Sequence, residues 1–256
     1  MKKLLALLLA VVMVFAFAAC SEDTAEQDLE NIQEKGKIVV GITEYAPMDY
    51  QENGEWVGFD ADFARAVAKK LGVEVEFKVI DWDNKFLELN SGAIDCIWNG
   101  MTITDEVKKN TSCSKPYAKN EQVIVMNKAL VDDYKDTDSI KELTFAVESG
   151  SAAESVCKDM GLDYVAVKTQ ADALLEVEAG SRLACIIDIT MATSMTGKGT
   201  SYEDLTQGIS LTKEEYGIGF RKNSNLTEKV NGYIDEMKAD GTLDELAKKY
   251  GVAVAD

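Results

Sequence analysis

The chain has 256 residues, a formal net charge of −18 at pH 7 and no histidine. A surface with this acidic excess repels nucleic acid and anionic lipid headgroups, so we expect neither as a partner. Without histidine a zinc or haem site has few ligands to use, and we expect no cofactor. Apolar residues make up 46% of the chain, which is enough for the cores of two modest lobes or of one large domain.

Residues 1–19 predict a secretory signal peptide. Two lysines follow Met1, and the apolar run 4–17 is too short to be a comfortable membrane span. Cys20 follows directly, as in bacterial lipoprotein signals, and this likeness implies cleavage before Cys20 and lipidation of its thiol. Two acyl chains on one cysteine are enough for stable membrane attachment. Ordinary secretion with Cys20 removed or free is the alternative. Residues 20–35 are predicted to be a lipidated tether.

The segment from 37 to 90 alternates strand and helix patterns. The apolar run 37–42 is typical of a buried strand, and 73–80 alternates apolar and charged residues as a half-exposed strand does. Between these strands, apolar residues recur at helical spacing over 59–71, and a shorter helix is predicted at 84–90. Alternation of this kind predicts parallel strands covered by helices.

The stretch 93–109 is the expected centre of the functional site. A short apolar run bounded by Gly92 and Gly100 predicts a buried strand, and Thr104 is the predicted N-cap of the helix that follows. Small ligands bind at such junctions because free backbone N–H groups and a helix N-terminus converge beyond the carboxyl end of the strand. We therefore expect a ligand site beside Gly100 and Thr102.

The runs NGMTIT (99–104) and SKPY (114–117) resemble the signature of the polar amino-acid-binding family of extracellular solute-binding proteins, which deliver ligands to ABC importers. The resemblance covers nearly all of the chain after the signal peptide. It implies an α/β, two-lobed periplasmic-binding-protein-like fold, in which each lobe has a mixed, mostly parallel sheet flanked by helices and the chain crosses between lobes twice. The implied first lobe comprises 36–126 and 217–256, and the second comprises 127–216.

In the first lobe the resemblance implies that two aromatic side chains form the walls of the ligand site. Tyr45 and Trp82 match these positions, while Asn99, Gly100 and Thr102 form the turn at the end of the central strand. Without the resemblance, the pattern predicts that Tyr45 is a turn residue with a half-buried ring, and this is the alternative.

The second lobe repeats the same rhythm, with strands predicted at 143–147, 163–167 and 184–188. The resemblance implies that the hydroxyl and backbone N–H of Ser151 meet the ligand's carboxylate, although Gly-Ser turns are common in βα loops. It also implies that Asp188, at the end of its strand, binds the ligand's α-ammonium group. The pattern alone predicts only the N-cap of the next helix for this aspartate.

One position departs from the family. Its motif usually continues to an arginine that binds the ligand's α-carboxylate, and this chain has Val107 there. Lys108 is not a simple replacement, since one step along a helix turns the side chain by about 100°. Three explanations are open. Ser151 and backbone N–H groups hold the carboxylate alone, a basic side chain reaches in from elsewhere, or the ligand has no α-carboxylate.

Glu148 bears on the nature of the ligand. The resemblance places it near the ligand's side chain, although a solvated loop glutamate is an equal alternative. Together with Asp188 it would put two carboxylates in a cleft walled by Tyr45 and Trp82, which suits a cation through charge pairing and cation–π contact. We predict a small amine-bearing solute, with an amino acid, including a cationic one, as the leading class.

We therefore expect the extracellular substrate-binding component of an ABC importer, a monomer that contacts its permease and is held to the cell membrane only by its lipid anchor. No nucleophile–base pair or metal constellation is visible, so we expect no enzyme. A dehydratase on the same architecture and a sensory ligand-binding module are the alternative classes. Free thiols are expected at four positions, although the compartment also permits disulfides; these are Cys96, Cys113, Cys157 and Cys185.

Overall fold

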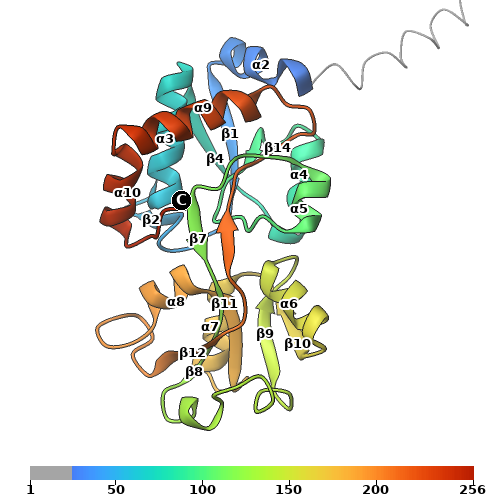
Figure 1. Cartoon of the computed structure of the whole chain (residues 1–256), viewed down its shortest axis with the longest axis vertical. Helices are drawn as coiled ribbons and strands as arrows, with labels where there is room; N and C mark the ends of the chain where they lie inside the picture. The colour runs from blue at the N-terminus through green and yellow to red at the C-terminus, as the bar shows by residue number, and fades with distance from the viewer. Residues whose placement is uncertain (1–24) are drawn as a thin grey trace, which may run out of the picture.

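The computed structural model describes residues 25–256, which form two lobes, each built on a five-stranded sheet (Figure 1). The predicted signal peptide and Cys20 lie outside the described residues. No helix within 25–256 combines the length and the apolar composition that a membrane crossing requires. The expected two-lobed α/β architecture is confirmed, and its two sheets are mixed, as the resemblance implied.

The sheet of the first lobe has the strand order β4-β1-β5-β14-β6. Strand β1 is parallel to β4 and β5, whereas β14 is antiparallel to both β5 and β6. The antiparallel strand β14 is contributed by the chain after it returns from the second lobe. The bounds are β1 Lys37–Ile42, β4 Glu74–Val79, β5 Cys96–Ile97, β6 Ser112–Cys113 and β14 Gly219–Phe220, with a separate hairpin of β2 Tyr50–Glu52 and β3 Glu55–Val57.

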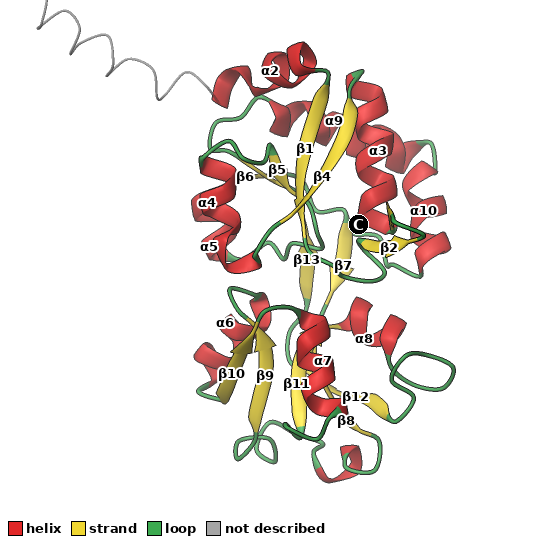
Figure 2. Ribbon diagram, turned by 180° about the vertical axis from the view of Figure 1, so that it is seen from behind, coloured by secondary structure: helices red, strands yellow, loops and turns green. Residues whose placement is uncertain are grey.

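Helices cover both faces of this sheet (Figure 2). In both views α3, α9 and α10 lie on one side, and α4 and α5 lie on the other. Helix α3 packs against β1 and β4, and α4 packs against β1 and β5. The bounds are α3 Phe59–Leu71, η2 Trp82–Asn84, α4 Lys85–Asn90, α5 Asp105–Asn110, α9 Leu226–Ala239 and α10 Thr242–Tyr250.

Helix α3 shows how the apolar pattern becomes packing. Its residues Phe59, Phe63, Val67 and Leu71 are all buried, as the helical spacing predicts. Burying one such side chain contributes about 1.5–3 kcal/mol, so this stripe holds the helix on the sheet. The helix ends at Gly72, whose φ of 75° is a left-handed conformation that glycine adopts without a Cβ clash.

The segment 25–35 is folded, which corrects the expected tether of residues 20–35. It forms η1 (Ala25–Gln27) and α2 (Asp28–Lys35), with Ile32 fully buried. The carboxylate of Asp28 lies 2.7 Å from the Arg221 guanidinium, which also lies 3.2 Å from Asp95. The sequence does not reveal this contact, because Arg221 is distant along the chain and an acidic composition is typical of a solvated segment.

The sheet of the second lobe has the strand order β10-β9-β11-β8-β12. Strands β10, β9 and β11 are parallel, and β8 runs antiparallel between β11 and β12. The strand bounds are β8 Gln122–Asn127, β9 Thr144–Glu148, β10 Asp163–Val167, β11 Ala184–Asp188 and β12 Leu205–Ser210. The helices are η3 Val131–Asp133, α6 Ala152–Met160, α7 Gln170–Glu178 and α8 Ile189–Met195.

The predicted lobe boundary at residue 126 is placed too late. Strand β8 pairs only within the second sheet, so the chain crosses before it. The two crossings are made by β7 (Ala118–Asn120) and β13 (Glu214–Tyr216), which pair antiparallel to each other. A strand pattern alone does not tell which sheet will receive the strand, because the pairing partners are far away in sequence.

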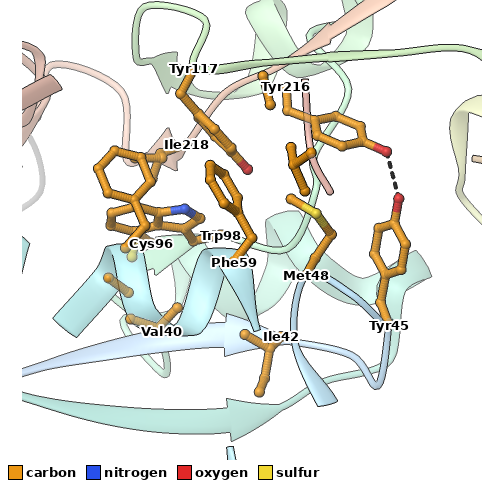
Figure 3. Close-up of a cluster of buried hydrophobic side chains, with 14 of the residues drawn as sticks. Val40, Ile42, Tyr45, Met48, Phe59, Cys96, Trp98, Tyr117, Tyr216 and Ile218 are labelled. Carbon is orange, nitrogen blue, oxygen red and sulfur yellow. Dashed lines mark hydrogen bonds between the residues drawn. The ribbon is translucent and has the colours of Figure 1, made fainter. Parts of the chain in front are cut away.

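A cluster of aromatic side chains lies where the first lobe meets the hinge strands (Figure 3). The ring of Phe63 meets Trp98 edge-on with 4.9 Å between centroids and meets Tyr117 at 5.5 Å. The ring of Tyr216 lies 6.4 Å from that of Tyr117 between centroids, and its hydroxyl points toward Tyr45. Aromatic pairs in this geometry add about 0.5–1.5 kcal/mol each beyond the contribution of their buried area. The cluster therefore stabilises the part of the first lobe that adjoins the crossing strands β7 and β13.

The four cysteines at positions 96, 113, 157 and 185 are free thiols, as expected. Burial raises the pKa of the Cys113 thiol to about 11 and that of Cys157 to about 12. Thiols with such pKa values are poor nucleophiles at neutral pH, so they act as small apolar core groups.

Candidate functional site

A cavity between the two lobes brings together all eight residues that the sequence predicted for the ligand site. Strands and loops of both sheets end at this cavity, which we call the cleft cavity. The first lobe contributes Tyr45, Trp82, Asn99, Gly100 and Thr102, and the second contributes Glu148, Ser151 and Asp188. Within residues 25–256 no group of three or more acidic or cysteine side chains could hold a metal ion.

The lobes are closed over the cleft cavity. Lys85 of the first lobe donates a hydrogen bond to the carbonyl of Gly150 in the second at 2.8 Å, and Lys168 forms a 3.0 Å ion pair with Asp81 outside the cavity. A Cβ placed on Gly150 would lie 2.9 Å from Cα of Asp83, so only glycine allows this approach. The closed cavity is small: the volume that the centres of water molecules can occupy inside it is about 30 Å³.

Asp188 is held by three side-chain amides. Its Oδ1 accepts hydrogen bonds from Asn120 and from Gln122, the latter at 2.6 Å, and its Oδ2 accepts one from Gln170. Burial raises the pKa of this carboxyl to about 6, and the nearby Glu214 carboxylate adds to the shift. The amides are neutral, so they orient Asp188 without neutralising its charge.

Glu148 ends β9 with its carboxyl group buried in the cleft cavity. The residue is 4% exposed, and its Oε1 atom has no hydrogen-bond partner among the described residues. Burial and, to a smaller extent, the charge of Asp188 raise the pKa of Glu148 to about 8, although the charge of Lys85 acts in the opposite direction. An empty cleft therefore holds Glu148 mainly in its protonated form at neutral pH.

Tyr45 and Trp82 are both buried and line the cleft cavity, as the resemblance implied. The Tyr45 hydroxyl also forms a hydrogen bond with Thr190 of the second lobe. A second one joins it to the Tyr216 hydroxyl at 2.5 Å, as Figure 3 shows. The ring is therefore available as a wall, while the hydroxyl joins the lobes.

The turn at 99–104 uses much of its polar capacity inside the protein. The Asn99 side chain accepts from the Thr43 hydroxyl at 2.7 Å, and the backbone N–H of Gly100 donates to the buried Asp60 carboxylate at 2.6 Å. The Thr102 hydroxyl donates to Glu214 at 2.9 Å. These residues line the cavity, and the bonds set the shape of its floor.

Ser151 lies at the N-cap of α6, where its hydroxyl accepts a hydrogen bond from the backbone N–H of Glu154 at 3.2 Å. The cap aims the N-terminus of α6 at the cleft cavity, whose lining continues into Ala152. A helix N-terminus carries partial positive charge, which suits an anionic group.

Val107 does not offer a polar group to the cleft. It lies 4% exposed in α5 and packs in an apolar cluster with Trp82, Leu89 and Met101. Where the family motif has an arginine, this chain therefore has an apolar side chain that packs in the core of the first lobe.

Residues 38–253 match the family described as bacterial extracellular solute-binding proteins, family 3. The chain belongs to this family. The resemblance drawn from the motifs at 99–104 and 114–117 is thus confirmed, and the two-lobed fold of this family 3 protein agrees with it.

Several other family 3 proteins are similar to this chain over most of their length. The arginine-binding extracellular protein ArtP of Bacillus subtilis (strain 168) is 34% identical over 262 residues, covering 98% of each chain. The L-cystine-binding protein TcyJ of Escherichia coli (strain K12) is 30% identical, covering 87% of this chain and 85% of TcyJ. A solved structure described as an ancestral arginine-binding protein bound to arginine is 38% identical, with a TM-score of 0.77 over 84% of this chain and 98% of its own.

The family match also bears on the expected absence of enzyme activity. The relatives reported above are named for binding, and the matched family is one of solute-binding proteins. This supports the expectation that the chain binds a ligand and does not transform it. Dehydratase activity has no support from these relatives.

Sequence reasoning missed several polar residues of this family 3 cleft, and two of them bear directly on its charges. Gln170, at the start of α7, both accepts from the backbone N–H of Asp188 at 2.9 Å and donates to its carboxylate. Lys85, the first residue of α4, is buried with its ammonium group in the cleft. Neither stands in a recognisable motif; the only signal for Lys85 was its place three residues after Trp82.

Proposed function

We propose that this protein is the extracytoplasmic binding component of an ABC importer and that its ligand is a cationic amino acid of the arginine class. The observation that carries the choice of a cationic ligand is a pair of buried carboxyl groups, Glu148 and Asp188, in one cavity. Neither forms an ion pair with a lysine or arginine of the described residues. A buried carboxylate without a counter-charge is unfavourable, and a ligand cation supplies one.

The two acidic groups suit two positive groups on one ligand. Asp188 is fixed by amides that leave its negative charge uncompensated, which fits an α-ammonium group. Glu148 has an oxygen without a partner, which fits a second cation at the end of the ligand's side chain. The rings of Tyr45 and Trp82 provide π-faces for that cation.

The named relatives support the same class. ArtP, similar over 98% of both chains, is named for arginine, and the ancestral protein was solved with arginine bound. The name of TcyJ points to cystine, whose far end carries a carboxylate as well as an ammonium group and therefore has no net charge. The buried Glu148 is our reason for preferring arginine to cystine.

The cell-surface arrangement is part of the proposal. Cleavage before Cys20 and lipidation of its thiol would hold a monomeric protein at the membrane, near its permease. Mass spectrometry of the protein isolated from its native membrane is expected to show diacylglycerol on Cys20. The variant Cys20→Ser should leave the membrane fraction, and its retention there would contradict the anchor.

Calorimetric titration with L-arginine and L-citrulline tests the ligand class, because citrulline has nearly the shape of arginine without the side-chain charge. Arginine is expected to bind about 10- to 100-fold more tightly, the worth of one charge-assisted hydrogen bond. Replacing Glu148 by Gln should remove most of that preference. Citrulline, cystine or glutamine binding as tightly as arginine would refute the cationic class.

A further inference from the structure

The side chain of Lys85 crosses from the first lobe into the cleft cavity. Its Nζ donates to the carbonyl of Gly150 at 2.8 Å and to the carbonyl of Trp82 at 3.3 Å. The ammonium lies 5.1 Å from the ring centroid of Trp82 and 4.7 Å from that of Phe86. The residue is only 4% exposed, which is rare for a lysine.

This ammonium group forms no ion pair within residues 25–256. No carboxylate of the described residues lies within ion-pair distance of Lys85, whereas exposed lysines elsewhere, such as Lys37 and Lys128, are paired. Burial lowers the pKa of Lys85, and the more distant charges of Glu106 and Glu148 offset this only in part. An ammonium has three N–H donors, and the two neutral carbonyls take two of them. One donor is left for another acceptor.

A second source of positive potential lies beside it. Gly150, whose carbonyl accepts from Lys85, immediately precedes the N-cap Ser151 of the nine-residue helix α6. The first turn of α6 also lines the cleft cavity through Ala152. The lysine of one lobe and the helix N-terminus of the other therefore converge on the same part of the cavity.

We propose that Lys85 binds the carboxylate of the ligand, together with the N-terminus of α6. This inference rests on the proposed function, and it names the group that orients the ligand. The carboxylate points toward Lys85 and α6, while the ammonium groups point toward Asp188 and Glu148. Val107 has no polar group and packs in the apolar cluster described above, so it does not bind the carboxylate.

The arrangement also links binding to closure. Lys85 belongs to the first lobe and α6 to the second, so a carboxylate between them attracts both lobes. In the closed empty cleft Lys85 already donates to the Gly150 carbonyl of the second lobe, and its remaining donor is free for that carboxylate. A charged acceptor held by both lobes adds a strong hydrogen bond that exists only when they are together, so the ligand favours the closed cleft over the open one.

The test compares amino acids with the amines that they become on loss of the carboxylate. Wild type is first titrated with arginine, histidine and glutamine, and the tightest binder is then paired with its amine: agmatine, histamine or 4-aminobutanamide. In Lys85→Met the amino acid is expected to lose about 10- to 100-fold in affinity. The amine should lose less than about threefold, and Lys85→Arg should recover part of the loss.

Lys168→Met is the matched control, because it removes an inter-lobe ion pair outside the cleft cavity. It should leave the ratio of the two affinities unchanged. Equal losses for the amino acid and the amine in Lys85→Met would overturn the proposal and make Lys85 a closure contact. If wild type binds the amino acid but the amine too weakly to measure, the crystal structure of the complex decides. A carboxylate oxygen more than 4 Å from Nζ would overturn the proposal.

The two proposals fail in different ways. Wild type that binds none of the three amino acids refutes the proposed function, and the inference on Lys85 falls with it. Wild type that binds an amino acid with an unchanged preference over its amine in Lys85→Met refutes only the role of Lys85.

Discussion

Glu148 makes cation binding depend on pH in a way that the structure allows us to work out. In the closed, empty cleft burial and the charge of Asp188 raise its pKa to about 8, from an ordinary value of 4.5. The raised pKa means that the carboxyl is protonated below about pH 8 and ionised above it. A ligand cation pairs only with the ionised form, so arginine must displace a proton, and its affinity should increase with pH.

The size of the effect follows from the ionised share of Glu148. With a pKa of about 8, that share is about 0.1 at pH 7 and about 0.5 at pH 8, so arginine affinity should rise about fivefold between them. About 0.9 proton should be released per arginine bound at pH 7. Asp188, whose pKa is about 6, is already largely ionised in this interval and adds little.

Calorimetry at pH 7.0, 7.5 and 8.0, in two buffers with different ionisation enthalpies, measures both the affinity and the released proton. Glu148→Gln should bind arginine more weakly, with an affinity nearly independent of pH and no proton released. Asp81→Asn is the control, since Asp81 lies outside the cleft cavity, and it should keep the wild-type pH slope. The same slope in Glu148→Gln as in wild type, or an affinity that falls as pH rises, would refute this reasoning.

Three further predictions concern Asp188, Asp60 and Tyr45. Asp188→Asn should lower arginine affinity about 10- to 100-fold in calorimetry with an unchanged circular dichroism spectrum, and an unaltered affinity would contradict its role. Burial raises the pKa of Asp60 to about 7, so the folded state holds its proton more tightly than the unfolded chain, and its contribution to stability is lost as pH rises from about 4 to 7. Urea unfolding should therefore show a larger loss of stability between pH 5 and 7.5 in wild type than in Asp60→Asn; equal losses count against it. Tyr45→Phe removes hydrogen bonds to Thr190 and Tyr216, and small-angle X-ray scattering of the empty protein should show a larger radius of gyration. An unchanged radius would mean that other contacts alone hold the lobes closed.

The order of strands and helices was readable from the sequence because it is recorded in local periodicity. The apolar stripe of α3 and the alternation along β4 needed no distant partner to be recognised. The motif at 99–104 also placed the cleft correctly, since the end of a strand followed by a helix start is a local pattern. The local pattern also placed Asp188 at the end of an apolar strand, but only the family resemblance assigned it to the ligand.

What depended on distant partners was not readable. The sequence places Asp28 in a solvated tether because Arg221, with which it forms a buried ion pair, lies near the other end of the chain. Strand β8 was assigned to the wrong lobe because its pattern does not name the sheet that it joins.

For this protein the sequence by itself determined the family, the two-lobed fold and the eight residues at the cleft. Only the tertiary structure decided where the charges of that cleft lie. Lys85 reads as an ordinary surface lysine until the second lobe covers it, and Glu148 reads as a loop glutamate until burial raises its pKa. The physical reason is that burial and charge pairing are properties of two surfaces brought together, and each local stretch of sequence describes only one of them.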